Sequence, residues 1–246
     1  MSVQSNELII YTANNMPEDN TSTVGGDINS GIRASFDDPS SAVQIVTYSS
    51  SASDTGTLSL TGRSTAGLII SDTISLSGTT KVSSSNTYER ILKVELSKVC
   101  DGIVTVSGTS INKITDVPIG ESGFRRPFYD ATSQVGVAKT YYEKLFIQNR
   151  NPTLALSNAK VIEVSTGFSS KITFALEDSK QSNQTTTDRG SAPTGVTGGF
   201  GDGPSGIVSD ELTATDYQGI WLKMSLDADE DSTNSFYEVQ ISGTTV

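Results

Sequence analysis

The sequence contains no histidine and a single cysteine, Cys100, among its 246 residues. Without histidine the chain lacks the commonest general base and the commonest zinc ligand, which excludes a Ser-His-Asp triad, a Cys-His pair and a histidine-ligated metal within this chain. One cysteine cannot form an intrachain disulfide, so no disulfide framework holds the fold. We therefore expect a protein that is not an enzyme and that has no cofactor.

Positive charge is also scarce, with 17 lysines and arginines against 28 aspartates and glutamates and a net charge of −11. Phosphate groups repel such a surface unless its basic residues gather in one patch, so we expect neither a nucleic-acid partner nor attachment to an anionic membrane. The most apolar stretches, ELIIY and GLII, are far too short to span a bilayer. The N-terminal stretch has no basic region followed by a long apolar region, so no signal peptide is predicted.

Serine and threonine, by contrast, make up roughly a quarter of the chain, well above ordinary usage. Together with valine and glycine they favour short twisted strands and tight turns over helices. Alternating segments recur at spacings of about 8 to 12 residues, which is typical of a β-sandwich. We expect strands over residues 42–49, 57–62, 66–78, 81–85, 88–97 and 102–108, and then over 140–149, 153–164, 170–178, 219–226 and 235–243.

The predicted fold is all-β, with two β-sandwich domains of immunoglobulin-like or jelly-roll-like type and an extended N-terminal arm. The arm, over residues 1–40, contains one strand at 7–13 followed by a stretch rich in Asn, Gly, Pro and Asp. The first domain spans residues 41–116, a connector spans 117–140, and the second domain spans 141–246. A long loop rich in Gly, Ser and Thr is expected at 180–206 within the second domain.

Residues 138–164 contain both helical and strand signals. The alternation of Tyr142, Lys144 and Phe146 with their neighbours favours a strand, and the sequence after Pro152 alternates again. We therefore expect a hairpin in which residues 150–152, Arg-Asn-Pro, form the turn.

The acidic stretch at residues 227–238 is the only candidate metal site. Its carboxylates fall at positions 1, 3, 5 and 12 of a calcium-binding loop: Asp227, Asp229, Asp231 and Glu238. The loop should have glycine where Ser232 stands and an apolar residue where Asn234 stands, and its flanks read as strands. We favour a solvated hairpin turn, with weak cation binding as the alternative.

Three other motifs have a functional and a structural interpretation. The candidate partner interface is the aromatic and arginine cluster Phe124, Arg125, Arg126, Phe128 and Tyr129, because arginine beside aromatics is favoured at interfaces; its structural alternative is a salt bridge between domains. Trp221, the sole tryptophan, is expected in the core, with a sugar-stacking platform as the alternative. The glycine-rich residues 198–206 lack the Lys and Ser/Thr of a phosphate-binding loop and are interpreted as a linker.

Several segments resemble modules of structural proteins of tailed bacteriophages. They are residues 54–97 (DTGTLSLTGRSTAGLIISDTISLSGTTKVSSSNTYERILKVELS), 123–164 (GFRRPFYDATSQVG and its continuation), 217–245 (the closing stretch), and the opening YTANNMPEDNTSTVGGDI. The resemblance covers most of the chain and rests on strand and turn patterns. It contains no catalytic residues to carry over.

The resemblance implies a virion structural protein, which we expect to be a cement or decoration protein of the head made in the host cytoplasm. Its expected partners are the major capsid protein or other virion proteins, and further copies of itself in a trimer or dimer. A tail, neck or fibre-associated position is the alternative within the virion. A bacterial surface adhesin or carbohydrate-binding module is the alternative from another class, and a glycosidase that uses a carboxylate pair is the third.

Overall fold

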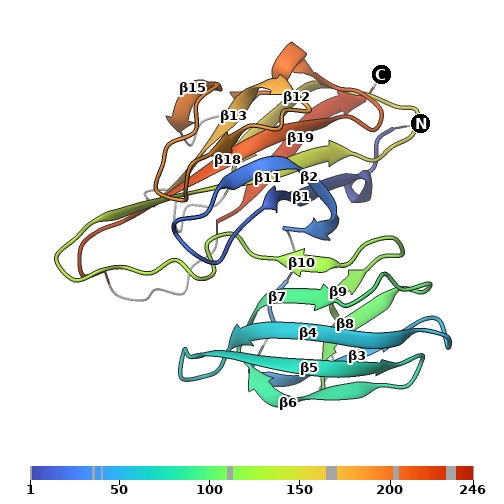
Figure 1. The fold of residues 1–246 in the computed structure, drawn as a ribbon. Helices are drawn as coiled ribbons and strands as arrows, with labels where there is room; N and C mark the ends of the chain where they lie inside the picture. Colours follow the sequence, from blue (N-terminus) through green and yellow to red (C-terminus); the bar gives the residue numbers. More distant parts are fainter. Residues whose placement is uncertain are drawn as a thin grey trace. The chain divides into compact units, whose positions relative to one another are not determined.

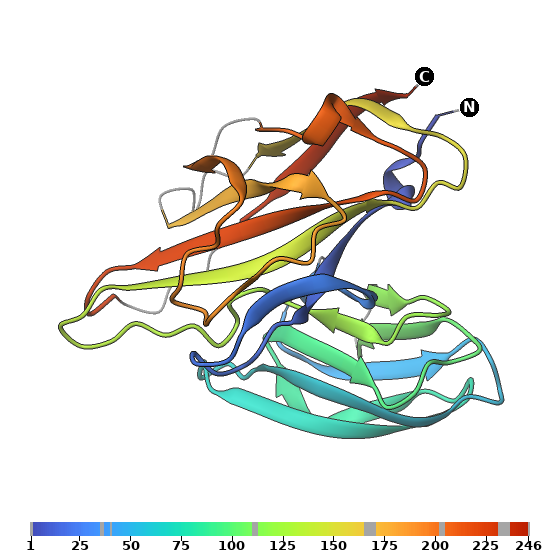
Figure 2. The same cartoon turned by 45° about the horizontal axis from the view of Figure 1, so that its top comes forward.

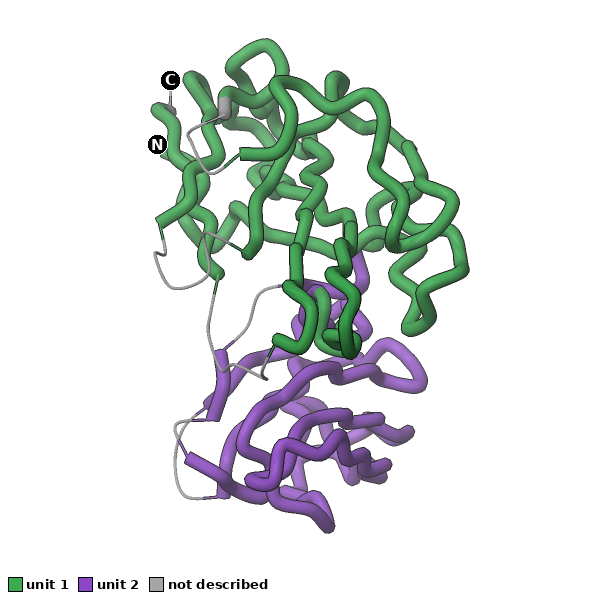
Figure 3. The backbone as a smooth tube through the Cα atoms, turned by 90° about the vertical axis from the view of Figure 1, so that its left-hand side faces the viewer, with its two compact units in different colours: residues 1–29, 128–246 green, residues 30–127 purple. Residues whose placement is uncertain are grey.

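The computed structural model describes residues 2–34, 37–39, 41–109, 113–164, 171–201, 205–230 and 237–245. Within these ranges the chain forms strands and two short 3₁₀ segments, η1 (Ser5–Glu7) and η2 (Val208–Asp210), with no α-helix (Figure 1). The all-β prediction is therefore confirmed. The chain divides into two compact units, coloured separately in Figure 3: unit 1 comprises Met1–Asn29 and Phe128–Val246, and unit 2 comprises Ser30–Pro127.

Unit 2 consists of two sheets. The first has the strand order β10 (Gly123–Arg125), β7 (Arg90–Leu96), β4 (Thr55–Arg63) and β5 (Ile69–Ser77), and β4 and β5 form the long hairpin seen in Figure 2. The second has the order β6 (Val82–Tyr88), β3 (Val43–Ser49), β8 (Val104–Gly108) and β9 (Lys113–Val117).

One apolar core connects these two sheets. Leu58 and Leu60 of β4 and Val94 of β7 share it with Ile45 of β3 and Val106 of β8, and all five side chains are fully buried. The intervening residues of β4 and β5 point outward, so the period-2 alternation read from the sequence is the alternation between core and solvent. This arrangement is sandwich-like, as the alternation predicted.

Unit 1 also contains two sheets. The larger has the order β15 (Val196–Gly201), β13 (Ile172–Lys180), β18 (Tyr217–Leu226), β11 (Lys139–Asn149), β1 (Leu8–Asn15) and the first half of β2 (Val24–Arg33), with β14 (Thr185–Thr186) paired to β2. The smaller is built around β12 (Leu156–Glu163), which pairs with β16 (Ser205–Gly206), β17 (Glu211–Leu212) and β19 (Val239–Thr245).

Strand β11 is the central element of unit 1, since β1 and β18 occupy its two edges. Seven consecutive residues of β11 are buried, which means that both of its faces are covered. Two of the seven are charged, Glu143 and Lys144, and successive residues of a strand point to opposite faces. Each charge therefore requires its own partner in the interior.

The N-terminal residues are not the arm that we expected over residues 1–40. Besides β1, they form β2, where the sequence VGGDINSGIR has little apolar periodicity. Its glycines have a packing role: a Cβ on Gly25, whose φ is +106°, would lie 2.5 Å from the carbonyl oxygen of Gln184 and 2.9 Å from the Trp221 ring. The long-range contact that makes this segment a strand has no local signal in the sequence.

The predicted hairpin between residues 140–149 and 153–164 is wrong. Both segments are strands, but β11 pairs with β1 and β18, whereas β12 pairs with strands of the smaller sheet. Asn149, the last residue of β11, fixes the point at which the chain leaves the larger sheet. Its Nδ2 donates to the carbonyl oxygens of Leu154, Leu212 and Thr213 at 2.8, 3.1 and 3.2 Å. Alternation specifies which face of a strand is buried and leaves the pairing partner open.

The expected connector and loop are partly ordered into strands. Residues 117–127 complete unit 2 through β10, and the division between the units falls at Pro127 and Phe128. Within the expected loop at 180–206, β14 pairs with β2 and β15 pairs with β13. The domain boundaries taken from the sequence therefore differ from those of the two compact units.

Candidate functional site

The predicted partner interface is divided between the units. Phe124 and Arg125 lie on β10 of unit 2 and are buried, and Phe128 and Tyr129 are buried in unit 1. Phe124 belongs to the core of unit 2. These four side chains are buried, so they do not form an exposed patch.

Arg126 forms a salt bridge within unit 2. Its Nη2 lies 2.6 Å from Oδ1 of Asp38, and its Nε donates to the carbonyl oxygen of Ile91 at 2.7 Å. Burial lowers the pKa of the guanidinium from its usual value, against the opposing effect of Asp38. Arg126 therefore forms an ion pair, as the structural interpretation of this motif expected. The pair lies inside unit 2, whereas the expectation was a salt bridge between two domains.

The acidic stretch at 227–238 is not a hairpin turn, because β18 and β19, the strands on either side of it, belong to different sheets. Asp227 and Glu230 both pair with the ammonium of Lys171, and the pKa of Lys171 is raised by these two carboxylates. Asp229 accepts the backbone N–H of Gly136 at 3.1 Å. Asp231 lies outside the described residues and Glu238 follows that gap.

A cluster of acidic, cysteine or histidine residues that could hold a metal ion is absent from the residues that the structure describes. Asp227 and Glu230 share the Lys171 ammonium, and Asp229 is held by the backbone of Gly136, so these three carboxylates are engaged with the protein itself. Lys171 and the Gly136 N–H occupy one oxygen each of Asp227 and Asp229, and the Lys171 ammonium would repel a cation bound beside it.

The Glu143 and Lys144 side chains of β11 both have interior partners. On one face, Nζ of Lys144 lies 2.8 Å from Oε1 of Glu177 and also donates to the carbonyl oxygens of Ser182 and Gln184 at 3.0 and 3.2 Å. Trp221 donates its indole N–H to the same Oε1 at 2.9 Å. Burial lowers the pKa of Lys144 and raises the pKa of Glu177.

On the opposite face, Glu143 meets the guanidinium of Arg189. Nη2 of Arg189 hydrogen-bonds to Oε1 of Glu143, and Nη1 lies 2.9 Å from Oδ2 of Asp130. Burial opposes the charge, but Glu143 and Asp130 together raise the pKa of Arg189. Oε2 of Glu143 accepts the backbone N–H of Phe128 at 3.0 Å. These groups tie the loops before β11 and after β14 to the central strand.

The side chains of Lys144, Glu177, Glu143 and Arg189 are at most 1% exposed, and Asp130 at the edge of the second cluster is 14% exposed. A substrate therefore has no access to them, and their role is structural. Trp221 is fully buried beside the first cluster, so its core interpretation is confirmed and a sugar-stacking role for it is excluded.

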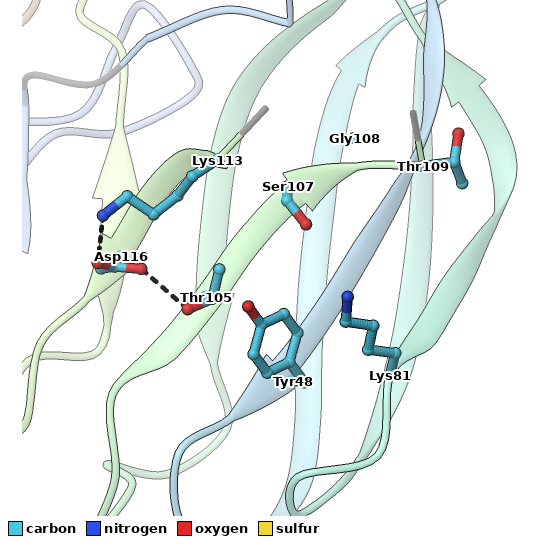
Figure 4. A pocket seen from close by; sticks show the side chains of 8 residues that line it. All are labelled: Tyr48, Lys81, Thr105, Ser107, Gly108, Thr109, Lys113 and Asp116. Carbon is cyan, nitrogen blue, oxygen red and sulfur yellow. Dashed lines mark hydrogen bonds and ion pairs between the residues drawn. The ribbon is translucent and has the colours of Figure 1, made fainter. Parts of the chain in front are cut away.

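The described residues form a polar pocket of about 450 Å³ on unit 2 (Figure 4). Its volume lies within the range of small-molecule sites, about 300–1,000 Å³. The lining residues come from β3, β8, β9 and the segments beside them: Tyr48, Lys81, Thr105, Ser107, Gly108, Thr109, Lys113 and Asp116.

Strand register explains why these residues meet. Tyr48 of β3 stands opposite Thr105 of β8, which stands opposite Asp116 of β9. Lys81 lies one residue before Val82, the partner of Thr47, and its Nζ is 5.3 Å from the centroid of the Tyr48 ring. The four side chains form a row across the outer face of the sheet, because the residues that alternate with them, such as Val104 and Val106, fill the core.

A β-bulge adds a second cation to this row. The register between β8 and β9 shifts between Val106 and Ser107, so that Ser107 stands opposite Lys113 while Ile114 is buried. Nζ of Lys113 donates to Oδ2 of Asp116 at 2.8 Å, and the hydroxyl of Thr105 donates to Oδ1 at 2.9 Å (Figure 4). The hydrogen bond and charge of Asp116 raise the pKa of Lys113, which keeps it a cation.

The sequence predicted no pocket here, although it contains one of the pocket's features. The outward positions of strands 42–49 and 102–108 carry Tyr48, Thr105 and Ser107, where an ordinary solvated face would also carry polar residues. The information that was missing is the strand order β6-β3-β8-β9, which brings Lys81 and Asp116 into the same row.

No helix in the described ranges is long and apolar enough to cross a membrane. No protein-family model, curated protein or solved structure matches this chain, so its function has to be argued from its own residues.

Proposed function

We propose that this chain is a structural component of a tailed-bacteriophage particle, and specifically a cement or decoration protein on the head. It acts through interfaces with protein neighbours and performs no bond-making chemistry. Each unit is proposed to be a sandwich of the immunoglobulin-like or jelly-roll-like type. Supporting this, the segments that resemble phage structural proteins contribute strands to both units: residues 54–97 contain β4 to β7, and residues 123–164 contain β10 to β12.

The observation that carries the proposal is the exposure of apolar side chains on ordered turns. In unit 2, Leu68 and Ile69 are 66% and 51% exposed at the turn between β4 and β5. Two hydrogen bonds order this turn, from the N–H of Ser64 to the carbonyl oxygen of Leu68 and from the N–H of Gly67 to that of Ser64. Paired apolar residues on an ordered turn can anchor a protein interface at little entropic cost.

Unit 1 has a comparable turn. Val135 is 86% exposed and Val137 is 47% exposed, and the bridge between Gln134 and Val137 closes the turn around Gly136. The turn is held further by Asp229, which accepts the N–H of Gly136. A chain with two such anchors can contact more than one neighbour, and many weak contacts on one particle add up to stable attachment.

The proposed partners are the major capsid protein or other virion proteins, together with further copies of this chain in a trimer or dimer. The net charge of −11 suits a protein that faces solvent and not the packaged genome. A tail, neck or fibre-associated position would use the same anchors. The proposed place of the protein is therefore the virion, and the head is the position tested first.

The test uses particles produced from the genome that encodes this chain. Purified particles should contain it in many copies, and it should sediment with heads that lack tails. A particle preparation free of the chain would overturn the virion proposal, whereas its presence on tails alone would overturn only the head assignment.

A variant tests the anchors themselves. Leu68→Ser with Ile69→Ser should weaken rebinding to depleted particles without lowering the melting temperature, since both side chains are exposed. Thr65→Ser is the matched control, because Thr65 lies in the same turn and is already polar and exposed. Equal rebinding of both variants would show that this turn is not an anchor.

A further inference from the structure

We propose that the pocket on unit 2 binds an acidic sugar, that is, a pyranose carrying a carboxylate, as a terminal or internal residue of a glycan. This binding goes beyond the proposed virion role and does not depend on it. The proposal rests on the row of side chains across β6, β3, β8 and β9 and on how their polar groups are already occupied.

One end of the row provides a cation. Lys81 lies against the Tyr48 ring, and none of the carboxylates in the described ranges forms an ion pair with it. Lys81 is exposed, so its ammonium is hydrated in the free protein and open to an anionic ligand group. The Tyr48 ring limits the directions in which this ammonium points.

The other end of the row provides acceptors for hydroxyl groups. Each oxygen of Asp116 receives one hydrogen bond, from Thr105 or from Lys113, and a carboxylate oxygen can accept two. The Tyr48 hydroxyl adds a group that can both donate and accept, whereas the Ser107 hydroxyl already donates to the carbonyl oxygen of Val46 at 3.3 Å and adds an acceptor. This arrangement matches the vicinal hydroxyls of a pyranose, with the sugar carboxylate directed toward Lys81.

The charges in the pocket also disfavour other ligands. A phosphate ester and an acidic sugar would both meet the two cations Lys81 and Lys113, but a sugar hydroxyl can donate to Asp116, whereas the doubly charged phosphate group has no donor for that carboxylate. A neutral sugar would form no charge-assisted contact with Lys81. Among the described residues that line the pocket, Asp116 is the only carboxylate, and glycoside hydrolysis requires a pair of carboxyl groups. The arrangement therefore suits binding and not cleavage.

The experiment measures binding of the full chain to an acidic-glycan array that includes oligogalacturonate, alginate and sialyllactose. Hits are then titrated by calorimetry against their neutral counterparts, such as galactose oligomers. Lys81→Gln, which removes the charge and keeps most of the side-chain length, should weaken binding about tenfold or more, as expected for the loss of one charge-assisted contact. Lys98→Gln is the control, since Lys98 is an exposed lysine of the same unit outside the pocket.

A second variant separates ligand contact from folding. Tyr48→Phe retains the ring and removes the hydroxyl, so it should lower the affinity without changing the melting temperature. Four results would overturn the proposal: no binding to any acidic glycan at millimolar concentrations, equal affinity for acidic and neutral sugars, equal affinity of Lys81→Gln and the wild type, or full competition by inorganic phosphate. None of these results bears on whether the chain is found in particles.

Discussion

The buried pair of Lys144 and Glu177 leads to a quantitative prediction about unit 1. Neither side chain has any exposure to solvent, and Lys144 supplies the only cation that contacts the Glu177 carboxylate among the described residues. Replacing Lys144 by Met leaves that carboxylate buried without a cation, with the Trp221 N–H and the Ser182 side chain as its remaining donors. Removing one partner of a buried ion pair typically costs about 3–5 kcal/mol of unfolding free energy.

This loss should depend on pH. Burial raises the pKa of Glu177 above 4.5, and loss of Lys144 removes the strongest opposing influence. A group whose pKa is higher in the folded state takes up its proton as the pH falls toward 4.5, so the penalty for the buried charge disappears over that range. The cost of Lys144→Met should therefore shrink by at most about 1.4 kcal/mol per pH unit between pH 7 and 4.5.

The double variant Lys144→Met with Glu177→Gln distinguishes an unpaired charge from a packing defect. Glutamine can still accept the Trp221 N–H and carries no charge, so the double variant should be more stable than Lys144→Met alone. Lys171→Met is the matched control in the same unit. Its partners Asp227 and Glu230 are 81% and 16% exposed and Lys171 itself is 24% exposed, so the expected cost is about 1 kcal/mol, well below that of Lys144→Met.

The assay is urea unfolding followed by tryptophan fluorescence. Trp221 is the sole tryptophan and is buried in unit 1, so the signal reports on that unit. The reasoning would be refuted if Lys144→Met cost no more than Lys171→Met, if its cost were the same at pH 7 and pH 5, or if the double variant were less stable than either single variant.

Three further predictions concern other contacts. Arg189→Lys keeps the charge but cannot span two carboxylates, so we expect unit 1 to lose about 1.5–3 kcal/mol in the same fluorescence assay; an unchanged midpoint would contradict this. The Asp54 pKa is lowered, chiefly by its hydrogen bond from Ser49, so its stabilising effect is present above pH 3.8 and is lost as the pH falls further. In unfolding followed by tyrosine near-UV circular dichroism, Asp54→Asn should accordingly be less stable than the wild type at pH 7 and nearly as stable in acid. A difference in unfolding free energy that does not change with pH would refute this role of the Asp54 carboxylate. Gly62→Ala should cost about 1–3 kcal/mol, because its Cβ would lie 2.4 Å from the Tyr88 ring, whereas Gly201→Ala, with no atom near its Cβ, should melt close to the wild type.

The sequence by itself determined the class of the fold and the positions of most strands. Alternation identified β4, β7 and β8 because each has one face in the core of unit 2, and that alternation is a local property of the chain. The absence of histidine excluded whole classes of catalytic chemistry without reference to structure. The core position of Trp221 also followed from its apolar surroundings along the strand.

Only the tertiary structure decided which strands pair and which polar groups meet. Residues 24–33 form β2, which contacts β14 and Trp221. Strand β12 follows β11 in the chain but pairs with strands of another sheet. The Lys144–Glu177 pair joins residues 33 positions apart, and the pocket row depends on the order β6-β3-β8-β9. Periodicity records which face of a strand is buried, whereas partner choice depends on contacts between distant segments, and a single sequence does not encode these locally.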